Sequence, residues 1–163
     1  MKATGLIVEY NPFHNGHIYH LTKAKELTEP DVLVAVMSGN WTQRGTPAVT
    51  NKWERAKIAI EYGVDLVLEL PSIAAVQNAD RFASGAVKVL ELAKVSSIVF
   101  GSECGNLEAL KEISEISFDP NHFKENLDAG YSYPASYDQF SSRYGPNDIL
   151  GVAYLKALQE TNI

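Results

Sequence analysis

The stretch that decides the fold is residues 2–17, which reads KATGLIVEYNPFHNGH. Its apolar run, Ala3–Val8, is short enough to predict a β-strand that is buried on both faces. The Asn-Pro dipeptide at 11–12 ends this strand, because proline has no backbone donor and restricts the residue before it. A helical pattern starts soon after, at about residue 17, and continues to residue 28. The stretch therefore predicts a strand, a tight connection and a helix, which is the opening unit of an α/β sheet.

Two histidines, His14 and His17, fall where this helix begins. Residues three apart lie side by side on a helix, and the positive end of a helix binds phosphate groups. Gly16 between them lets a ligand approach the backbone closely. This is also the edge at which open α/β sheets bind ligands. We interpret the pair as a triphosphate site, in which two imidazoles and free helix N–H groups stabilise charge during attack on phosphorus.

Two other interpretations of the histidines remain open. His20 extends the pattern to three histidines at intervals of three, which is compatible with a metal site. Metal sites usually add a carboxylate or a thiolate, and the sequence places none on that face, so we assign no metal ligands. The pair can also be surface histidines that cap a helix. We favour the phosphate site and expect His20 to be a packing residue or a polar neighbour.

The rest of the chain alternates strand and helix patterns. We expect strands at 2–9, 32–37, 64–70 and 97–100, and helices at 17–28, 51–62, 80–92, 107–115, 122–129 and 149–159. Asn51 followed by Glu54 predicts a helix cap, and Gly63 predicts a left-handed stop. Residues 131–144 are expected to form a loop or a short helix. This order predicts an α/β fold with a Rossmann-like, doubly wound parallel sheet.

Composition limits the class of protein. The chain has 163 residues, of which 45% are hydrophobic, enough for one domain with a substantial core. Its net charge of −6 gives no whole-surface attraction for nucleic acid, so such a partner needs a local patch. The single cysteine, Cys104, excludes an internal disulfide and fits a reducing compartment. The sequence shows no signal peptide and no apolar run of about 20 residues, so we expect a cytoplasmic protein.

Seven segments, in order, resemble the bacterial tRNA(Met) cytidine acetate ligase family, a branch of the nucleotidyltransferases with a His-x-Gly-His motif. They are EYNPFHNGH (9–17), VMSGN (36–40), QRGTPA (43–48), KW (52–53), GVDLVLELP (63–71), FGSE (100–103) and PNDILG (146–151). The resemblance extends over nearly the whole chain, and the ordered set is far more specific than the first motif alone. It implies that the sheet is of the nucleotidyltransferase type.

The resemblance implies a two-step reaction. ATP activates acetate as acetyl-adenylate, with Mg²⁺ expected alongside ATP, and the acetyl group passes to the wobble cytidine of elongator tRNA(Met). His14 and His17 would be catalytic. The residues carried over as ATP-binding are Ile7, Val8, Glu9, Tyr10, Asn11, Pro12, Phe13, His14, Asn15, Gly16, His17, Ile18, Tyr19, His20, Gly101 and Asn147.

Four further polar residues follow the second predicted strand. Gln43 and Arg44 lie in a loop with glycines, whereas Lys52 and Arg55 are three apart on one helix face at the same sheet edge as His14. We expect them to contact phosphates or the tRNA backbone. For Arg55 a plain solvated helix face is an alternative of equal weight.

Family members are longer than this chain, and their second nucleotide motif and C-terminal tRNA-binding region are absent from it. We therefore expect residues 1–163 to be an ATP-binding nucleotidyltransferase domain of an incomplete or shortened enzyme. Two other functions remain open. One is an adenylyltransferase acting on a small phosphorylated metabolite, and the other is a nucleotide-binding module without turnover.

Overall fold

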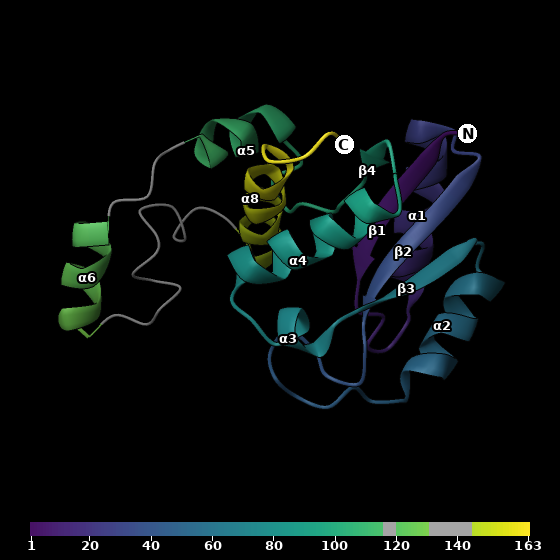
Figure 1. Ribbon diagram of the computed structural model, residues 1–163, viewed down its shortest axis with the longest axis horizontal. Helices are drawn as coiled ribbons and strands as arrows, with labels where there is room; N and C mark the ends of the chain where they lie inside the picture. The colour runs from purple at the N-terminus through teal and green to yellow at the C-terminus, as the bar shows by residue number, and fades with distance from the viewer. Residues whose placement is uncertain (116–119, 131–144) are drawn as a thin grey trace.

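The computed structural model describes residues 1–115, 120–130 and 145–163 (Figure 1). The segment at 131–144, expected to be a loop or short helix, lies outside the described residues. Four parallel strands form one sheet in the order β3-β2-β1-β4. They are β1 (Ala3–Val8), β2 (Val32–Ser38), β3 (Leu66–Leu70) and β4 (Ser97–Ile98). The helices are α1 (Asn15–Thr28), α2 (Lys52–Glu61), α3 (Ser72–Ala75), α4 (Ala79–Leu92), α5 (Leu107–Ser114), α6 (Pro120–Asp128) and α8 (Pro146–Leu158).

The two faces of the sheet carry separate cores, because side chains alternate along each strand. On β2, Val34 and Val36 pack with Leu70 of β3 and with α4, whereas the intervening Leu33, Ala35 and Met37 pack against α1 and α2. Figure 1 shows α4 in front of the sheet, α1 behind it and α2 beyond β3 at the lower right. Helices on both faces confirm the predicted doubly wound α/β fold.

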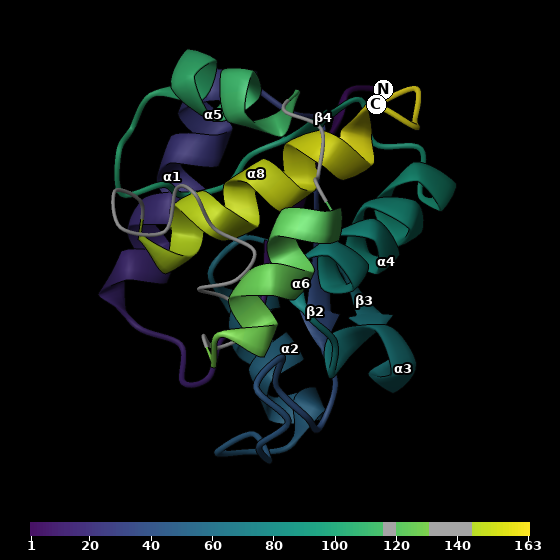
Figure 2. The same ribbon diagram turned by 90° about the vertical axis from the view of Figure 1, so that its left-hand side faces the viewer.

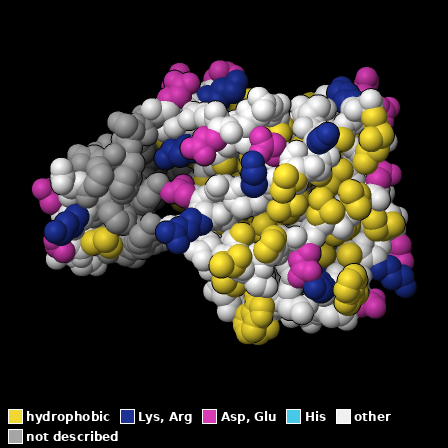
Figure 3. All heavy atoms as spheres, viewed as in Figure 1, with side chains coloured by type: hydrophobic (Ala, Val, Ile, Leu, Met, Phe, Trp, Pro, Cys, Tyr) yellow, Lys and Arg dark blue, Asp and Glu magenta, His cyan; other side chains and the backbone are white. Residues whose placement is uncertain are grey.

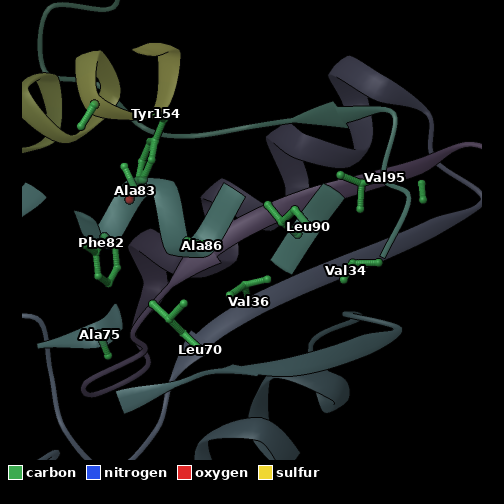
Figure 4. Packing of buried hydrophobic residues seen from close by; sticks show 12 residues of the cluster. Val34, Val36, Leu70, Ala75, Phe82, Ala83, Ala86, Leu90, Val95 and Tyr154 are labelled. Atoms are coloured by element: carbon green, nitrogen blue, oxygen red, sulfur yellow. The ribbon is translucent and has the colours of Figure 1, made fainter. Parts of the chain in front are cut away.

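Two small residues allow helices to come close to their neighbours. A Cβ on Gly5 would lie 2.8 Å from the Leu90 methyl groups, so the glycine lets α4 approach β1. A Cβ on Gly151 would lie 2.8 Å from Phe100, so it allows α8 to rest on the segment after β4. Figure 4 shows Tyr154 of α8 above Ala83 of α4, which places α8 on the same side as α4. In Figure 2, α8 crosses the molecule above α4.

Most predicted element boundaries shift by only a few residues. The helix expected from residue 17 begins at Asn15, because His14 supplies its cap. The strand expected from residue 64 begins at Leu66, because Val64 N–H still donates to the Ala59 carbonyl of the preceding helix at 3.0 Å. Asn51 caps α2, and Gly63 has a φ of +95°, as predicted. The short helix α3 was not predicted; it follows Pro71 and has no side-chain cap.

Exposed apolar side chains gather over one face of the described chain, across β3 and α4 (Figure 3). Within residues 1–115, 120–130 and 145–163, none of the helices is long and apolar enough to span a membrane.

Candidate nucleotide-binding site

The connection from β1 to α1 forms the centre of the candidate site. Tyr10 adopts a left-handed φ of +50°, and the Asn11–Pro12 peptide bond is cis. The chain then reaches His14, whose extended backbone makes it the N-cap of α1. The connection thus brings both histidines to the start of a 14-residue helix at the carboxyl edge of the sheet.

The two histidines form a reciprocal capping box. His14 Nδ1 accepts a hydrogen bond from the Gly16 N–H at 3.1 Å, and His17 Nδ1 accepts one from the His14 N–H at 3.2 Å. Their rings stack with a centroid separation of 3.8 Å. Because both Nδ1 atoms accept from backbone donors, each neutral ring carries its hydrogen on Nε2. The pair therefore offers two Nε2–H donors from adjacent, stacked rings.

This arrangement differs from our expectation of free helix N–H groups behind the rings. The Gly16 N–H is bound to the His14 ring, and the His17 N–H donates to the His14 carbonyl at 2.9 Å. These two amides are therefore already bound within the chain, and the Nε2–H groups are the donors that the two rings have left. The helix dipole still favours an anion at this end.

Aromatic packing fixes the His17 ring and affects its protonation. His17 lies edge-on to the buried Tyr10 ring at 4.9 Å, and Phe13 packs on Tyr10 at 4.8 Å and on Tyr62 at 4.9 Å. Burial, together with the nearby His14 and His20, lowers the pKa of His17 to about 4. His17 is therefore neutral near pH 7, and its ring offers a hydrogen-bond donor rather than a positive charge.

His20 ties α1 to the end of β4. Its Nε2 lies 3.2 Å from the Val99 carbonyl, and burial lowers its pKa although that hydrogen bond raises it. This contact matches the polar-neighbour interpretation of His20. Within the described residues, no cluster of three or more His, Cys, Asp or Glu side chains is arranged to hold a metal ion.

The loop after β4 is bound to the start of α8. Glu103 accepts hydrogen bonds from the Asn147 side chain at 2.8 Å and from the Asp148 N–H at 2.9 Å. The buried Asp148 in turn accepts from the Ser102 hydroxyl at 2.6 Å and from the Cys104 N–H at 3.1 Å. Burial alone would raise the pKa of Asp148, but these hydrogen bonds lower it. Gly101 and Asn147 are thus held on neighbouring segments, and both are exposed.

A second loop, residues 39–50, is joined to the β1–α1 connection by side chains. Glu9 accepts from the Gln43 N–H at 2.7 Å, and Asn11 accepts from the Val49 N–H at 2.7 Å. Arg44 is exposed in this loop. Lys52 pairs with Glu69 at 2.5 Å at the start of α2.

Arg55 does not share the surface position of Lys52. Only 1% of Arg55 is exposed, and its guanidinium donates to backbone carbonyls rather than facing solvent. The two residues are three apart on α2, yet they face different surroundings. This position does not suit contact with a ligand phosphate or with tRNA, and it equally excludes a solvated helix face.

The remaining residues expected at the ATP site differ in exposure. Val8 and Tyr10 are buried. Those that are partly buried are Ile7, Glu9, Asn11, Phe13, His17, Ile18 and His20, and those that are exposed are Pro12, His14, Asn15, Gly16 and Tyr19.

Comparison with known proteins assigns the family. The family model described as HIGH Nucleotidyl Transferase matches residues 1–163. The chain belongs to the HIGH nucleotidyl transferase family. This membership agrees with the resemblance carried by the His-x-Gly-His motif and with the histidine pair at the start of α1.

Relatives with longer chains share this domain. The tRNA(Met) cytidine acetate ligase of Caldicellulosiruptor saccharolyticus is 48% identical over 99% of this chain, which covers 44% of the relative. The ligase of the same name from Oenococcus oeni is 48% identical over 100% of the chain, which covers 45% of it. The chain therefore spans less than half the length of these curated relatives.

Solved structures support the fold. Thermotoga maritima TmcAL bound with alpha-thio ATP is 45% identical, with a TM-score of 0.88 over 100% of this chain and 45% of the solved one. A lipopolysaccharide core biosynthesis protein from Thermoplasma volcanium is 20% identical, with a TM-score of 0.50 over 81% of this chain and 91% of its own. The second similarity concerns the fold alone.

Sequence reasoning overlooked the contacts by which Glu103 and Asp148 join the loop after β4 to the start of α8. Asp148 stands three positions after Gly145, the spacing of a capping box, and its carboxylate accepts from the Gly145 N–H at 3.1 Å. That spacing was the available signal. Glu103 caps the same helix from 44 positions away, and no local pattern reveals such a contact.

Proposed function

We propose that this chain binds ATP with its triphosphate against the Nε2–H groups of His14 and His17. The observation that carries the proposal is the reciprocal capping box, which fixes both rings and leaves their Nε2–H groups as donors. The ATP analogue bound to the T. maritima relative supports the choice of nucleotide. The expected contact region runs from Ile7 to His20 and includes Gly101 and Asn147.

In the full enzyme context, the activated substrate is acetate. An acetate oxygen attacks the α-phosphorus of ATP, the bond to the bridging oxygen of the β-phosphate breaks, and pyrophosphate leaves. The Nε2–H donors of His14 and His17 stabilise the negative charge that develops on the phosphoryl oxygens. Mg²⁺ enters with ATP as part of the substrate.

The second step transfers the acetyl group to tRNA(Met). The exocyclic amine of the wobble cytidine attacks the acetyl carbonyl of the adenylate, and the bond from the carbonyl carbon to the AMP oxygen breaks. AMP leaves with the electron pair of that bond, and the amine loses one proton to solvent. Gln43, Arg44 and Lys52 are the proposed phosphate or tRNA contacts. The chain has a net charge of −6, so the overall charge of this domain does not attract tRNA, and binding tRNA requires a further source of affinity.

ATP–pyrophosphate exchange tests this proposal. Exchange that requires acetate supports the ligase, whereas exchange that requires a phosphorylated metabolite instead supports an adenylyltransferase. ATP binding in a calorimeter without exchange in the presence of any acid supports a non-catalytic nucleotide-binding module. Absence of ATP binding would overturn the proposal itself.

A further inference from the structure

The largest fully buried side chain in the described part of the protein is a charged one, Arg55. It is the fourth residue of α2, and only 1% of it is exposed. Burying a charged group is costly unless its donors are satisfied, so the partners of this guanidinium are informative.

The Arg55 guanidinium donates to four backbone carbonyls. Nη1 donates to the Glu9 carbonyl at 2.6 Å and to the Ser38 carbonyl at 3.0 Å, Nη2 donates to the Gly39 carbonyl, and Nε donates to the Thr50 carbonyl at 3.3 Å. Glu9 follows the last residue of β1, Ser38 ends β2, and Thr50 precedes the cap of α2. One side chain thus joins three chain segments that converge at the carboxyl edge of the sheet.

Two of these segments lead directly to the candidate site. The chain passes from Glu9 through Tyr10 to the histidine box, and from Gly39 into the loop of residues 39–50. The same two segments are also joined by the Gln43 N–H to Glu9 and the Val49 N–H to Asn11, both at 2.7 Å. Arg55 therefore binds the same two segments that these two hydrogen bonds join.

We infer that Arg55 is a positioning residue, which sets the β1–α1 connection and the 39–50 loop in the arrangement that the nucleotide site requires. A planar guanidinium suits this role, because its five donors spread in a fixed fork, whereas a lysine ammonium presents its donors at one point. Burial lowers the pKa of Arg55, and nearby Glu9 and Glu69 oppose that shift. Its effect on ATP rests on the proposed function, but its effect on the loop does not.

The test compares Arg55→Gln and Arg55→Lys with the control Leu33→Ala. Leu33 is 1% exposed and lies near the first residue of β2, whereas Ser38 is the last residue of that strand. Truncation of Leu33 therefore weakens the core away from the site. Backbone amide hydrogen exchange of Gln43 and Val49 is measured by NMR below the unfolding transition. Both arginine variants should speed exchange of these two amides by about tenfold or more, whereas Leu33→Ala should leave them near the wild-type rate.

ATP affinity provides the second readout. Both arginine variants should weaken ATP binding by about tenfold or more. They should also reduce the rate of ATP–pyrophosphate exchange by up to about a hundredfold, because small displacements of the binding groups slow the reaction. Leu33→Ala should bind ATP like the wild type. If the wild type binds no ATP, the proposed function fails, while the amide measurement still decides the role of Arg55.

The inference is overturned if Gln43 and Val49 stay as protected in the arginine variants as in Leu33→Ala. Should neither arginine variant fold, the wild-type protein decides the question through the exchange of guanidinium protons. Those of Arg55 should exchange at least about tenfold more slowly than those of the exposed Arg44, because the Arg55 protons are held by carbonyls. Equal rates for the two arginines would overturn the inference.

Discussion

Replacing His17 with alanine should separate chemistry from stability. The change removes the Nε2–H donor, the 3.2 Å hydrogen bond from the His14 N–H, and the stacked contact at 3.8 Å. His14 is exposed, so water can solvate its freed N–H. The lost hydrogen bond and ring contact together cost about 1–2 kcal/mol. For a chain of this length, that lowers Tm by about 2–8 °C.

The effect on turnover should be much larger. Losing one donor that stabilises developing charge reduces the rate on the order of 10²–10³-fold. Acetate-dependent ATP–pyrophosphate exchange of His17→Ala is therefore expected to fall by about that factor, at a temperature where circular dichroism shows the variant to be folded.

His17→Asn is the matched control. Its side-chain oxygen can still accept from the His14 N–H, as the N3 residue of a capping box does, but it offers no donor at the Nε2 position. We expect the Tm of this variant to lie closer to that of the wild type than the Tm of His17→Ala does. Its rate of ATP–pyrophosphate exchange should fall by the same factor as in His17→Ala. Near-wild-type exchange in both variants would refute the assignment of charge stabilisation to His17.

Three further predictions concern pH and local packing. The His17 pKa of about 4 should appear in an NMR titration, and the free energy of unfolding should fall as pH drops from about 6.5 towards 4, because the unfolded chain takes up a proton that folded His17 does not. A free energy of unfolding that stays constant over that range, or that falls equally steeply in His17→Asn, would contradict this. Asn51→Ala removes a side-chain oxygen that accepts from the Trp53 and Glu54 N–H groups, both at 3.0 Å, and should cost about 1 kcal/mol in urea unfolding, whereas Asn51→Asp should cost less. Gly151→Ala should lower the free energy of unfolding by about 1–3 kcal/mol, because its Cβ would lie 2.8 Å from Phe100. Gly101→Ala has open space around its Cβ, so it should unfold like the wild type while weakening ATP binding.

The sequence predicted the parts of the fold that depend on local patterns. The apolar run Ala3–Val8, the Asn51 cap and the Gly63 stop are each written within a few neighbouring residues, and the structure has all three. The first helix began two residues earlier than predicted, since a histidine ring, and not a serine or aspartate, caps it. The four-residue α3 was missed because it has no side-chain cap and is too short for a periodic pattern.

Contacts between distant segments could not be predicted in this way. The carbonyls that hold Arg55 come from residues up to 46 positions away, so its helical spacing alone gave no sign of burial. The same holds for the contact between His20 and Val99, which are 79 positions apart. The histidine pair was identified from its spacing, but the use of both Nδ1 atoms as caps depends on the turn at residues 10–14, which no spacing rule describes.

A crystal structure of the protein soaked with a non-hydrolysable ATP analogue tests the central claim most directly. We predict that phosphate oxygens lie within hydrogen-bonding distance, about 2.7–3.2 Å, of Nε2 of both His14 and His17. A triphosphate bound elsewhere, or histidine rings turned away from it, would contradict the account.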